Sequence, residues 1–386
     1  MLEKSTAKPL TLELMKNFFR RRENSRNSQR NDRIGSLGLI QHSRPSYLPA
    51  KNPDEETKHQ KEHDEILESV RRRETQAEKE RNKKREERYK EEERLLVDSR
   101  LWTSDILPNF EQLRLSREVQ DLWWRGLPPS IRGRVWRLGI SNKLNIQGDI
   151  YRNCLNELRE KVNHESLVAI RLDVSRTFPV LCVFQEEGPL NEPLRSVLAA
   201  YCVYRPEVGY VQGMSFIGAV LTLNMEPHDA FVCFSNLLDN PCHKAAFTLD
   251  QRQMNVYYEV FAAALLKNLP RVHAHFISSG LSPDFYLLDW VYTIYAKAMP
   301  LDVACRVWDV FVKDGDEFLF RTALGVLNLY QEELLGMDFV RCAQFLTKLP
   351  ENLQASQLFE SIGVMTVCPG GGNFQKIIDD VSRGNS

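Results

Sequence analysis

Three short segments of the sequence combine charged or amide side chains with residues that fix the backbone. In the first, Asp173 and Arg176 lie three residues apart and Pro179 follows them, so a helix that carries both on one face should end there. This spacing lets a carboxylate hold a guanidinium near a helix end. Taken alone, such a pair is most often a surface ion pair that contributes well under about 1 kcal/mol.

The second segment places a glutamine on a constrained loop. Tyr210, Gln212 and Gly213 come directly before an apolar run that predicts a helix. Gly209 and Gly213 flank the loop and allow a tight turn, which would put Gln212 at a helix N-terminus. The simpler interpretation of the same residues is a tight helix entry with no further role.

The third segment contains a proline pair, Pro128 and Pro129, which predicts the start of a helix. Arg132 and Trp136 follow four residues apart and would share one helix face, where a guanidinium can stack on an indole. By itself this pattern indicates a structural role.

Several common sites are absent from the sequence. It has no G-x-x-x-x-G-K-[ST] loop for phosphates, no H-E-x-x-H, no G-x-S-x-G and no kinase H-R-D. His228, Cys233, Cys242 and His243 match no zinc-ligand spacing. The eight cysteines include no C-x-x-C pair, which predicts buried, reduced thiols in a cytosolic protein. We therefore expect no nucleotide, cofactor or metal of the protein's own.

The elements that must position these segments are predicted to be helices. Beyond Trp102, apolar residues recur at helical spacing, and period-two strands are not evident. The main domain is therefore predicted to be all-α. Prolines separate the later helical stretches, which we expect over residues 250–269, 284–299, 301–312, 317–335 and 338–349.

The net charge of -1 conceals an uneven distribution. Residues 1–50 carry ten basic and four acidic side chains, and residues 54–97 alternate Glu, Lys and Arg without Pro or Gly. We expect a disordered basic arm over 1–53, which is either a solvated tail or a contact for anionic lipid or a partner. Residues 54–97 predict a charged, solvent-exposed helix with too few apolar residues for a coiled-coil dimer.

The remainder divides into a main domain over 98–350 and a C-terminal helical extension and tail over 351–386. The main domain is slightly acidic, which argues against nucleic acid as a partner. The first residues form no signal-peptide core, and the longest apolar run, Met214 to Met225, is about half a membrane span. We expect a soluble protein whose membrane contact is peripheral.

Together, the three segments resemble the signature motifs of the TBC (Tre-2/Bub2/Cdc16) domain of Rab GTPase-activating proteins. The match runs in family order from about residue 120 to 340, and a later segment from Arg306 to Arg321 resembles the family too. Within the family, the sequence looks most like the branch of members twelve and fourteen. The matching residues are Trp123-x-x-Gly126-x-Pro128 with Arg132-x-x-x-Trp136, Ile170-x-x-Asp173-x-x-Arg176-Thr177-x-Pro179, and Tyr210-x-Gln212-Gly213-Met214.

This resemblance implies a helical domain that stimulates GTP hydrolysis on a Rab-type small GTPase, which would carry the GTP and Mg²⁺. Arg176 would match the family's arginine finger and Gln212 its glutamine finger. Asp173 would orient the arginine, and Thr177 would help to fix the loop. The supporting residues Tyr210, Gly213, Arg132 and Trp136 would complete the loop and the scaffold.

Two other functions stay open at this point. The domain could be a non-catalytic Rab-binding scaffold in trafficking, or the charged helix could be the functional element, as a cytoskeletal or spacer helix. The resemblance also implies a cytoplasmic protein peripheral to endosomal or Golgi membranes. Trafficking or autophagy factors could then bind the N-terminal region.

Overall fold

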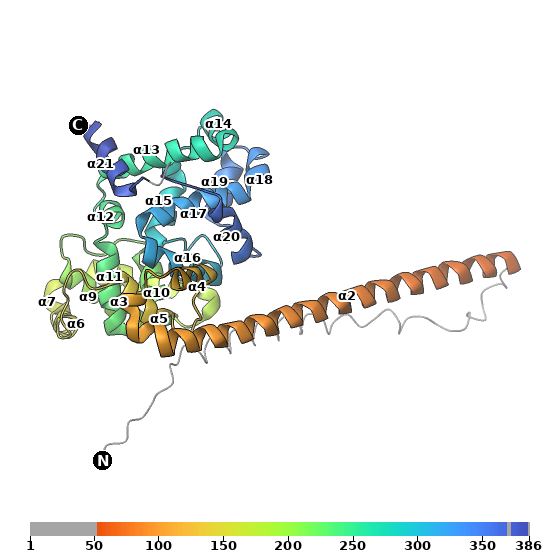
Figure 1. Ribbon diagram of the computed structural model, residues 1–386, viewed down its shortest axis with the longest axis horizontal. Helices are drawn as coiled ribbons and strands as arrows, with labels where there is room; N and C mark the ends of the chain where they lie inside the picture. The colour runs from red at the N-terminus through yellow and green to blue at the C-terminus, as the bar shows by residue number, and fades with distance from the viewer. Residues whose placement is uncertain (1–51, 369–371, 385–386) are drawn as a thin grey trace, which may run out of the picture. The chain divides into compact units, whose positions relative to one another are not determined.

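The computed structural model describes residues 52–368 and 372–384 (Figure 1). Across these residues the chain forms helices joined by turns and contains no strand, so the all-α prediction is confirmed. The chain divides into two compact units, Met1–Ser104 and Asp105–Ser386. The predicted disordered arm over 1–53 lies outside the described residues, apart from its last two positions.

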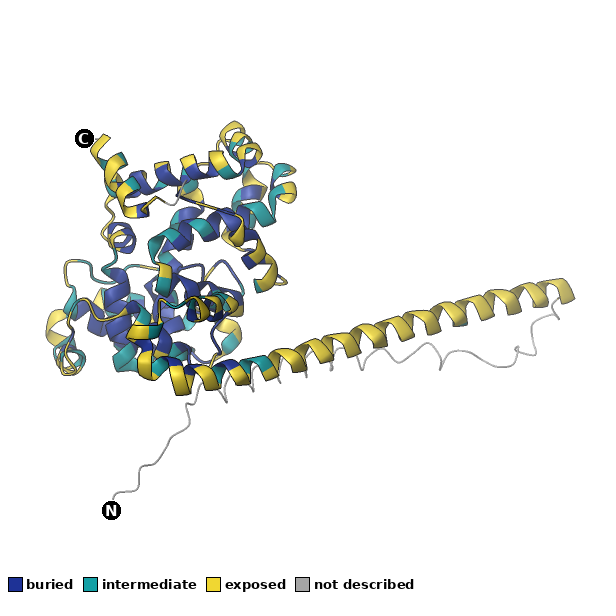
Figure 2. Cartoon of the chain, in the orientation of Figure 1, coloured by how far each residue is buried: buried dark blue, intermediate teal, exposed yellow. Residues whose placement is uncertain are grey.

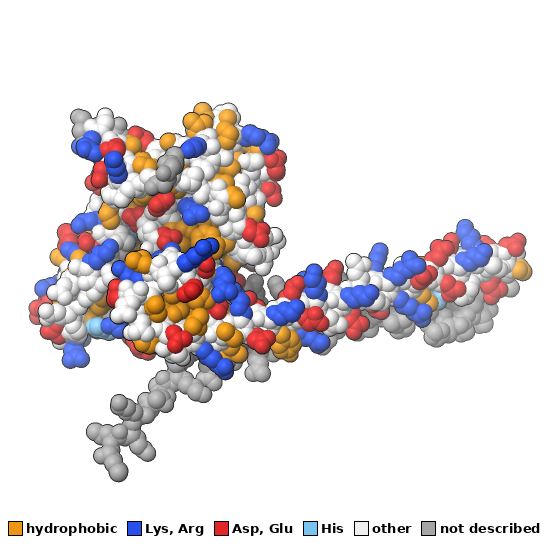
Figure 3. All heavy atoms as spheres, in the orientation of Figure 1, with side chains coloured by type: hydrophobic (Ala, Val, Ile, Leu, Met, Phe, Trp, Pro, Cys, Tyr) orange, Lys and Arg blue, Asp and Glu red, His pale blue; other side chains and the backbone are white. Residues whose placement is uncertain are grey.

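The first unit contains one long helix, α2 (Pro53–Leu101). It begins where the side chain of Asn52 accepts a hydrogen bond from the backbone N–H of Asp54. Acidic residues fill its first turn, where their negative charge interacts favourably with the helix dipole. Most of its surface is exposed (Figure 2), and acidic and basic side chains alternate along it (Figure 3). Ion pairs at i,i+4, such as Arg72 with Glu68, contribute a few tenths of a kcal/mol each. The predicted helix over 54–97 is therefore present and slightly longer.

The second unit is a bundle of short helices. None of the helices within the described residues combines the length and the apolar character that a membrane span requires. In chain order, the α-helices of this unit are α3 (Phe110–Leu113), α4 (Arg117–Arg125), α5 (Arg132–Ile140), α6 (Ile150–Asn156), α7 (Leu158–Lys161), α8 (His164–Arg176), α9 (Asn191–Tyr204), α10 (Met214–Asn224), α11 (Pro227–Leu238), α12 (Pro241–Phe247), α13 (Gln251–Asn268), α14 (Pro270–Ser279), α15 (Leu287–Thr293), α16 (Leu301–Asp314), α17 (Asp316–Leu329), α18 (Gln331–Leu335), α19 (Phe339–Thr347), α20 (Ala355–Gly363) and α21 (Phe374–Gly384).

Helix α10 lies at the centre of the core around the first half of this unit. Its sequence, MSFIGAVLTLN, is apolar on nearly every side, and such a helix has to be buried. It contacts α9 and α11 along its length and also α5, α8 and α15. The helix that follows the glutamine loop is thus fixed from several directions.

Two stretches that were predicted as single continuous helices are broken in the structure. The stretch 284–299 contains a 3-10 turn, then α15, and then two left-handed residues, Ile294 and Tyr295, at φ 45° and 62°. Tertiary contacts hold this break, because the Trp308 indole donates to the backbone oxygen of Ile294 and the Tyr295 hydroxyl donates to that of Leu319. The stretch 317–335 likewise divides at Tyr330 into α17 and α18.

The described residues beyond 350 belong to the second unit and pack against its earlier helices. Helix α20 lies along α17, where the Arg321 guanidinium donates to the backbone oxygens of Ile362 and Met365. Gly325 permits this approach, because a Cβ there would lie 2.4 Å from Cγ1 of Ile362. Helix α21 contacts α13.

Seven of the eight cysteines are buried, as predicted, and all eight are free thiols. Cys182 is the exception. It is exposed because it lies in a surface turn that a left-handed backbone, at φ 56°, closes.

Candidate functional site

Helix α8 ends at the first candidate residue. It begins at Asn163, whose side chain accepts a hydrogen bond from the backbone N–H of Ser166 at 2.8 Å, and it turns Ile170 and Val174 into the core. Thr177 leaves the helix with an extended backbone, and Pro179 follows in a 3-10 turn. Arg176 is therefore the last helical residue, and its side chain is 66% exposed.

The buried carboxylate of Asp173 joins this helix end to the glutamine loop. One of its oxygens accepts a hydrogen bond from Nη2 of Arg176, and the other accepts one from the Tyr210 hydroxyl at 2.8 Å. Burial and the charge of Asp173 both raise the pKa of Tyr210 well above its usual range, so the phenol stays protonated as a donor. Arg176 also donates through Nε to the backbone oxygen of Leu172 at 3.2 Å.

A second link joins the same two segments. The Thr177 hydroxyl lies 2.7 Å from the backbone oxygen of Asp173 and 2.9 Å from Oγ of Ser215, so it can donate to the first and accept from the second. Thr177 and Ser215 are both buried. The structure therefore brings together two motifs that lie almost forty residues apart in the sequence.

Gln212 is exposed on the turn that precedes α10. Gly213 caps this helix with φ 102°, and Gly209 begins the loop with φ 64°. Both values are left-handed, which glycine adopts without the penalty that other residues incur. The backbone N–H of Val211 lies 3.3 Å from the sulfur of Met214, which is a further contact within the loop.

Arg132 and Trp136 lie elsewhere, in the core, and they converge on a carboxylate. Arg132 donates to both oxygens of Asp309 on α16 at 3.0 to 3.3 Å, and Trp136 donates to one of them at 3.0 Å. The backbone N–H of Leu127 donates to Asp309 as well, at 3.1 Å. The Trp136 ring packs against Trp308 at 5.4 Å. The two residues thus tie α5 to α16 and share Asp309 as their acceptor.

Sequence reasoning missed the parts played by Asp309 and Ser215. A usable signal was present for Asp309, which is one carboxylate within the apolar run Val307-Trp308-Asp309-Val310-Phe311. A buried carboxylate needs donors, and the arginine and tryptophan of the Pro128 segment are suited to supply them. Ser215 carries no comparable signal in the sequence.

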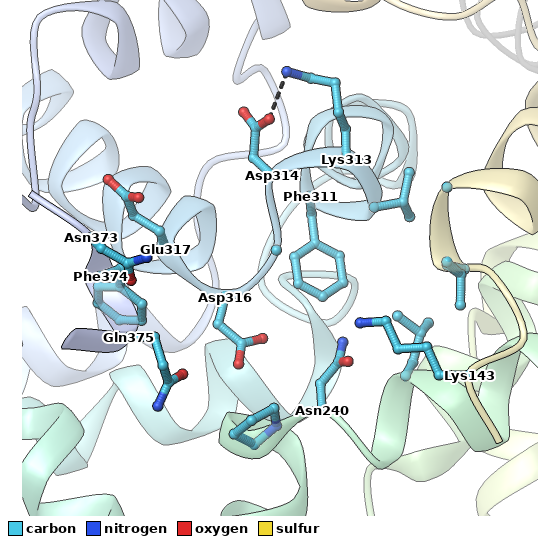
Figure 4. Close-up of a pocket in the computed structure, with 16 residues that line it drawn as sticks. Lys143, Asn240, Phe311, Lys313, Asp314, Asp316, Glu317, Asn373, Phe374 and Gln375 are labelled. Carbon is cyan, nitrogen blue, oxygen red and sulfur yellow. Dashed lines mark ion pairs between the residues drawn. The ribbon is translucent and has the colours of Figure 1, made fainter. Parts of the chain in front are cut away.

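A separate cavity of about 460 Å³ lies between the ends of α5 and α16 and the starts of α12, α17 and α21 (Figure 4). The side chains of Lys143, Asn240 and Asp316 point toward it, and Lys313 forms an ion pair with Asp314 at its edge. Burial raises the pKa of Asp316 to about 6. Its lining includes no residue of the three motifs, so it is distinct from the Arg176 and Gln212 surface.

Comparison with known proteins identifies the family. Residues 129–335 match the family model of the Rab-GTPase-TBC domain, RabGAP-TBC. The chain belongs to this family. Drainin of Dictyostelium discoideum is 33% identical to it over 375 residues, which cover 83% of this chain and 86% of Drainin.

The branch expected from the motifs is also confirmed. TBC1 domain family member 14 of Homo sapiens is 46% identical over 353 residues, covering 86% of this chain and 51% of that protein. Member 12 of Xenopus tropicalis is 47% identical over 353 residues, covering 86% and 52%. The chain therefore spans about half the length of these relatives.

Solved structures agree on the fold of the TBC domain. The Chlamydomonas flagellar RabGAP TBC domain superimposes with a TM-score of 0.58 at 19% identity, covering 70% of this chain and 93% of that structure. The Ypt/Rab-GAP domain of Gyp1p gives a TM-score of 0.52 at 16% identity, covering 67% and 95%. At these identities the likeness establishes the fold alone.

Proposed function

We propose that this TBC domain accelerates GTP hydrolysis on a Rab-type small GTPase, which carries the GTP and Mg²⁺. The observation that supports this proposal best is that Arg176 and Gln212 are exposed on two segments that Asp173, Tyr210, Thr177 and Ser215 fasten together. The polar groups that hold the segments are buried or half-buried, whereas the two side chains that could reach a partner point into solvent.

The chemistry of the two side chains suits hydrolysis on a partner. Negative charge spreads over the transferred phosphoryl oxygens in the transition state, and an arginine supplied in trans is worth about 10³ to 10⁵ in rate. The planar guanidinium of Arg176 can bind two phosphate oxygens at once, which an ammonium cannot. The amide of Gln212 can both donate and accept hydrogen bonds, which is what positioning an attacking water requires.

Asp173 is proposed to orient Arg176. Its carboxylate is anchored by Tyr210, and only one of its oxygens bonds Arg176, so the guanidinium keeps other N–H groups for a phosphate. Because Arg176 bonds to its own helix through Nε and Nη2, its side chain is partly ordered before a partner arrives.

The test is single-turnover GTP hydrolysis by a panel of Rab proteins with the wild-type chain, Arg176→Ala, Arg176→Lys and Gln212→Ala. We expect Arg176→Ala to lower the stimulated rate on the responding Rab by about 10³-fold or more. Lysine should restore little of it, because an ammonium cannot make the bidentate contact. Arg195→Ala is the matched control, since the Arg195 side chain is 40% exposed and pairs with an acid three residues earlier, Glu192.

The proposal fails if no Rab is accelerated, or if Arg176→Ala and Gln212→Ala leave the rate unchanged. GTP-dependent binding that survives Arg176→Ala without any acceleration would instead favour a non-catalytic Rab scaffold. The expected setting, a cytoplasmic protein at the periphery of endosomal or Golgi membranes that regulates recycling or autophagy, is part of the proposal. Imaging the tagged chain beside markers of these membranes tests it separately.

A further inference from the structure

The turn directly after Arg176 is held in a strained conformation. Phe178 and Cys182 both have left-handed backbones, at φ 44° and 56°, and neither is glycine. Between them runs a 3-10 turn, Pro179–Leu181. Strain of this kind persists only where the surrounding structure enforces it, and it clusters at sites that act on a ligand.

The contacts that enforce this turn come from the core. The Phe178 ring packs edge-on against Phe216 of α10, with centroids 5.4 Å apart, and also lies near Phe184. The backbone N–H of Leu181 donates to the oxygen of Phe178 at 2.9 Å, and that of Cys182 donates to the oxygen of Pro179 at 3.2 Å. The turn is thus fixed to the same helix that begins at the glutamine loop.

The turn presents an apolar side chain to solvent. Val180 is 78% exposed, and Leu172, one helical turn before Arg176, is 50% exposed. The Nε of Arg176 lies 3.2 Å from the backbone oxygen of Leu172, so the guanidinium stem runs beside that residue. Two exposed apolar side chains therefore precede and follow the proposed finger, each four residues from Arg176 along the chain.

We infer that Val180 and Leu172 dock against apolar side chains of the GTPase that border its bound nucleotide, and that they contribute to the choice of GTPase. This inference rests on the proposed function. Arg176 can reach a partner's nucleotide only if that partner comes within one side-chain length of the end of α8. Such an approach covers the surface beside the arginine, and Val180 stands on a rigid support there, so its burial loses little conformational freedom.

The occupant is a protein surface rather than a small molecule, because the two side chains are exposed and line none of the described pockets. An apolar contact of this kind stabilises the complex before reaction and the transition state of hydrolysis to the same extent. It should therefore affect KM and leave the limiting rate largely unchanged.

The experiment measures stimulated GTP hydrolysis on the responding Rab as a function of TBC concentration for Val180→Ser, Leu172→Ser and the double variant. We expect each single variant to raise KM by about tenfold, from the apolar area that docking removes from water, with the limiting rate within twofold of wild type. The control is Ile277→Ser, since Ile277 is 70% exposed on α14, whose main contacts are with α13 and α18. Val180→Ile, which keeps an apolar side chain, should restore a KM near that of wild type.

Two results would overturn the inference while the proposed function stands. In the first, Arg176→Ala abolishes stimulation and the double variant keeps the wild-type KM. In the second, Val180→Ser lowers the limiting rate and leaves KM unchanged. If Arg176→Ala has no effect at all, the proposed function itself fails. Because both apolar side chains are exposed, the serine variants should fold, and a wild-type circular dichroism spectrum and melting temperature would show that they do.

Discussion

Replacing Asp309 by asparagine tests the electrostatics of the core most directly. The Asp309 side chain is fully buried and accepts hydrogen bonds from Leu127, Arg132 and Trp136. Burial by itself would lower the pKa of Arg132, but the charge of Asp309, its hydrogen bonds with Arg132 and other nearby acidic groups together outweigh burial and raise that pKa above its usual value. Asparagine removes the countercharge and places an amide N–H₂ among donors.

Breaking a buried ion pair from one side costs about 3–5 kcal/mol, because the remaining charge stays in the core without compensation. We therefore expect Asp309→Asn to lower the free energy of unfolding by about that amount. Asp302→Asn, on the exposed face of the same helix, should change it by less than about 0.5 kcal/mol. Replacing both partners, as Arg132→Met with Asp309→Leu, should recover much of the loss, since no lone charge is then buried.

Urea denaturation followed by tryptophan fluorescence and far-UV circular dichroism measures these differences. The reasoning is refuted if Asp309→Asn costs less than about 1 kcal/mol. It is also refuted if the double variant is as unstable as the sum of its single variants, because their effects would then be independent.

Three further predictions concern packing, the site and pH. Gly133→Ala should lower stability by about 1–3 kcal/mol in a thermal melt, because a Cβ there would lie 2.0 Å from the backbone oxygen of Asn224, and an unchanged melting temperature would contradict this packing. Tyr210→Phe should lower the stimulated GTPase rate by about tenfold, the worth of one hydrogen bond to a carboxylate, and wild-type rates would exclude its anchoring role. Burial raises the pKa of Asp316 to about 6 and lowers that of His243 to about 4. The free energy of unfolding therefore falls as pH rises from about 4 to 6, because Asp316 ionises in the core. It also falls as pH decreases from about 6.5 to 4, because His243 becomes protonated, so the two contributions change stability in opposite directions over this range. In Asp316→Asn only the His243 contribution should remain, so that urea denaturation should show a loss of stability of roughly 3 kcal/mol as pH falls from 6.5 to 4. A pH dependence like that of the wild type in this variant would refute the assignment.

Local patterns in the sequence predicted the features that local chemistry controls. The charged helix, the end of α8 near Pro179 and the helix after Gly213 follow from composition, proline and glycine, each of which acts within a few residues. The motif resemblance gave the family because it combined three such segments in order.

The features that the sequence did not predict depend on long-range contacts. Helix α15 ends at Thr293 because the Trp308 indole bonds the backbone of Ile294 and the phenol of Tyr295 bonds the backbone of Leu319, which holds both residues in left-handed conformations although the apolar spacing continues to 299. The strain at Phe178 is likewise invisible in spacing, since it is set by Phe216 on a helix almost forty residues away.

The distance along the chain between Arg132 and Asp309 also constrains how the domain folds during synthesis. The two residues are 177 positions apart, and a ribosome adding about 5 to 20 residues per second needs on the order of ten seconds or more to reach the second. Until then α5 carries an arginine and an indole that have no acceptor in the core. We expect nascent chains that end before α16 to remain open around α5 and to be chaperone substrates, and the domain to close only when its acidic residue emerges.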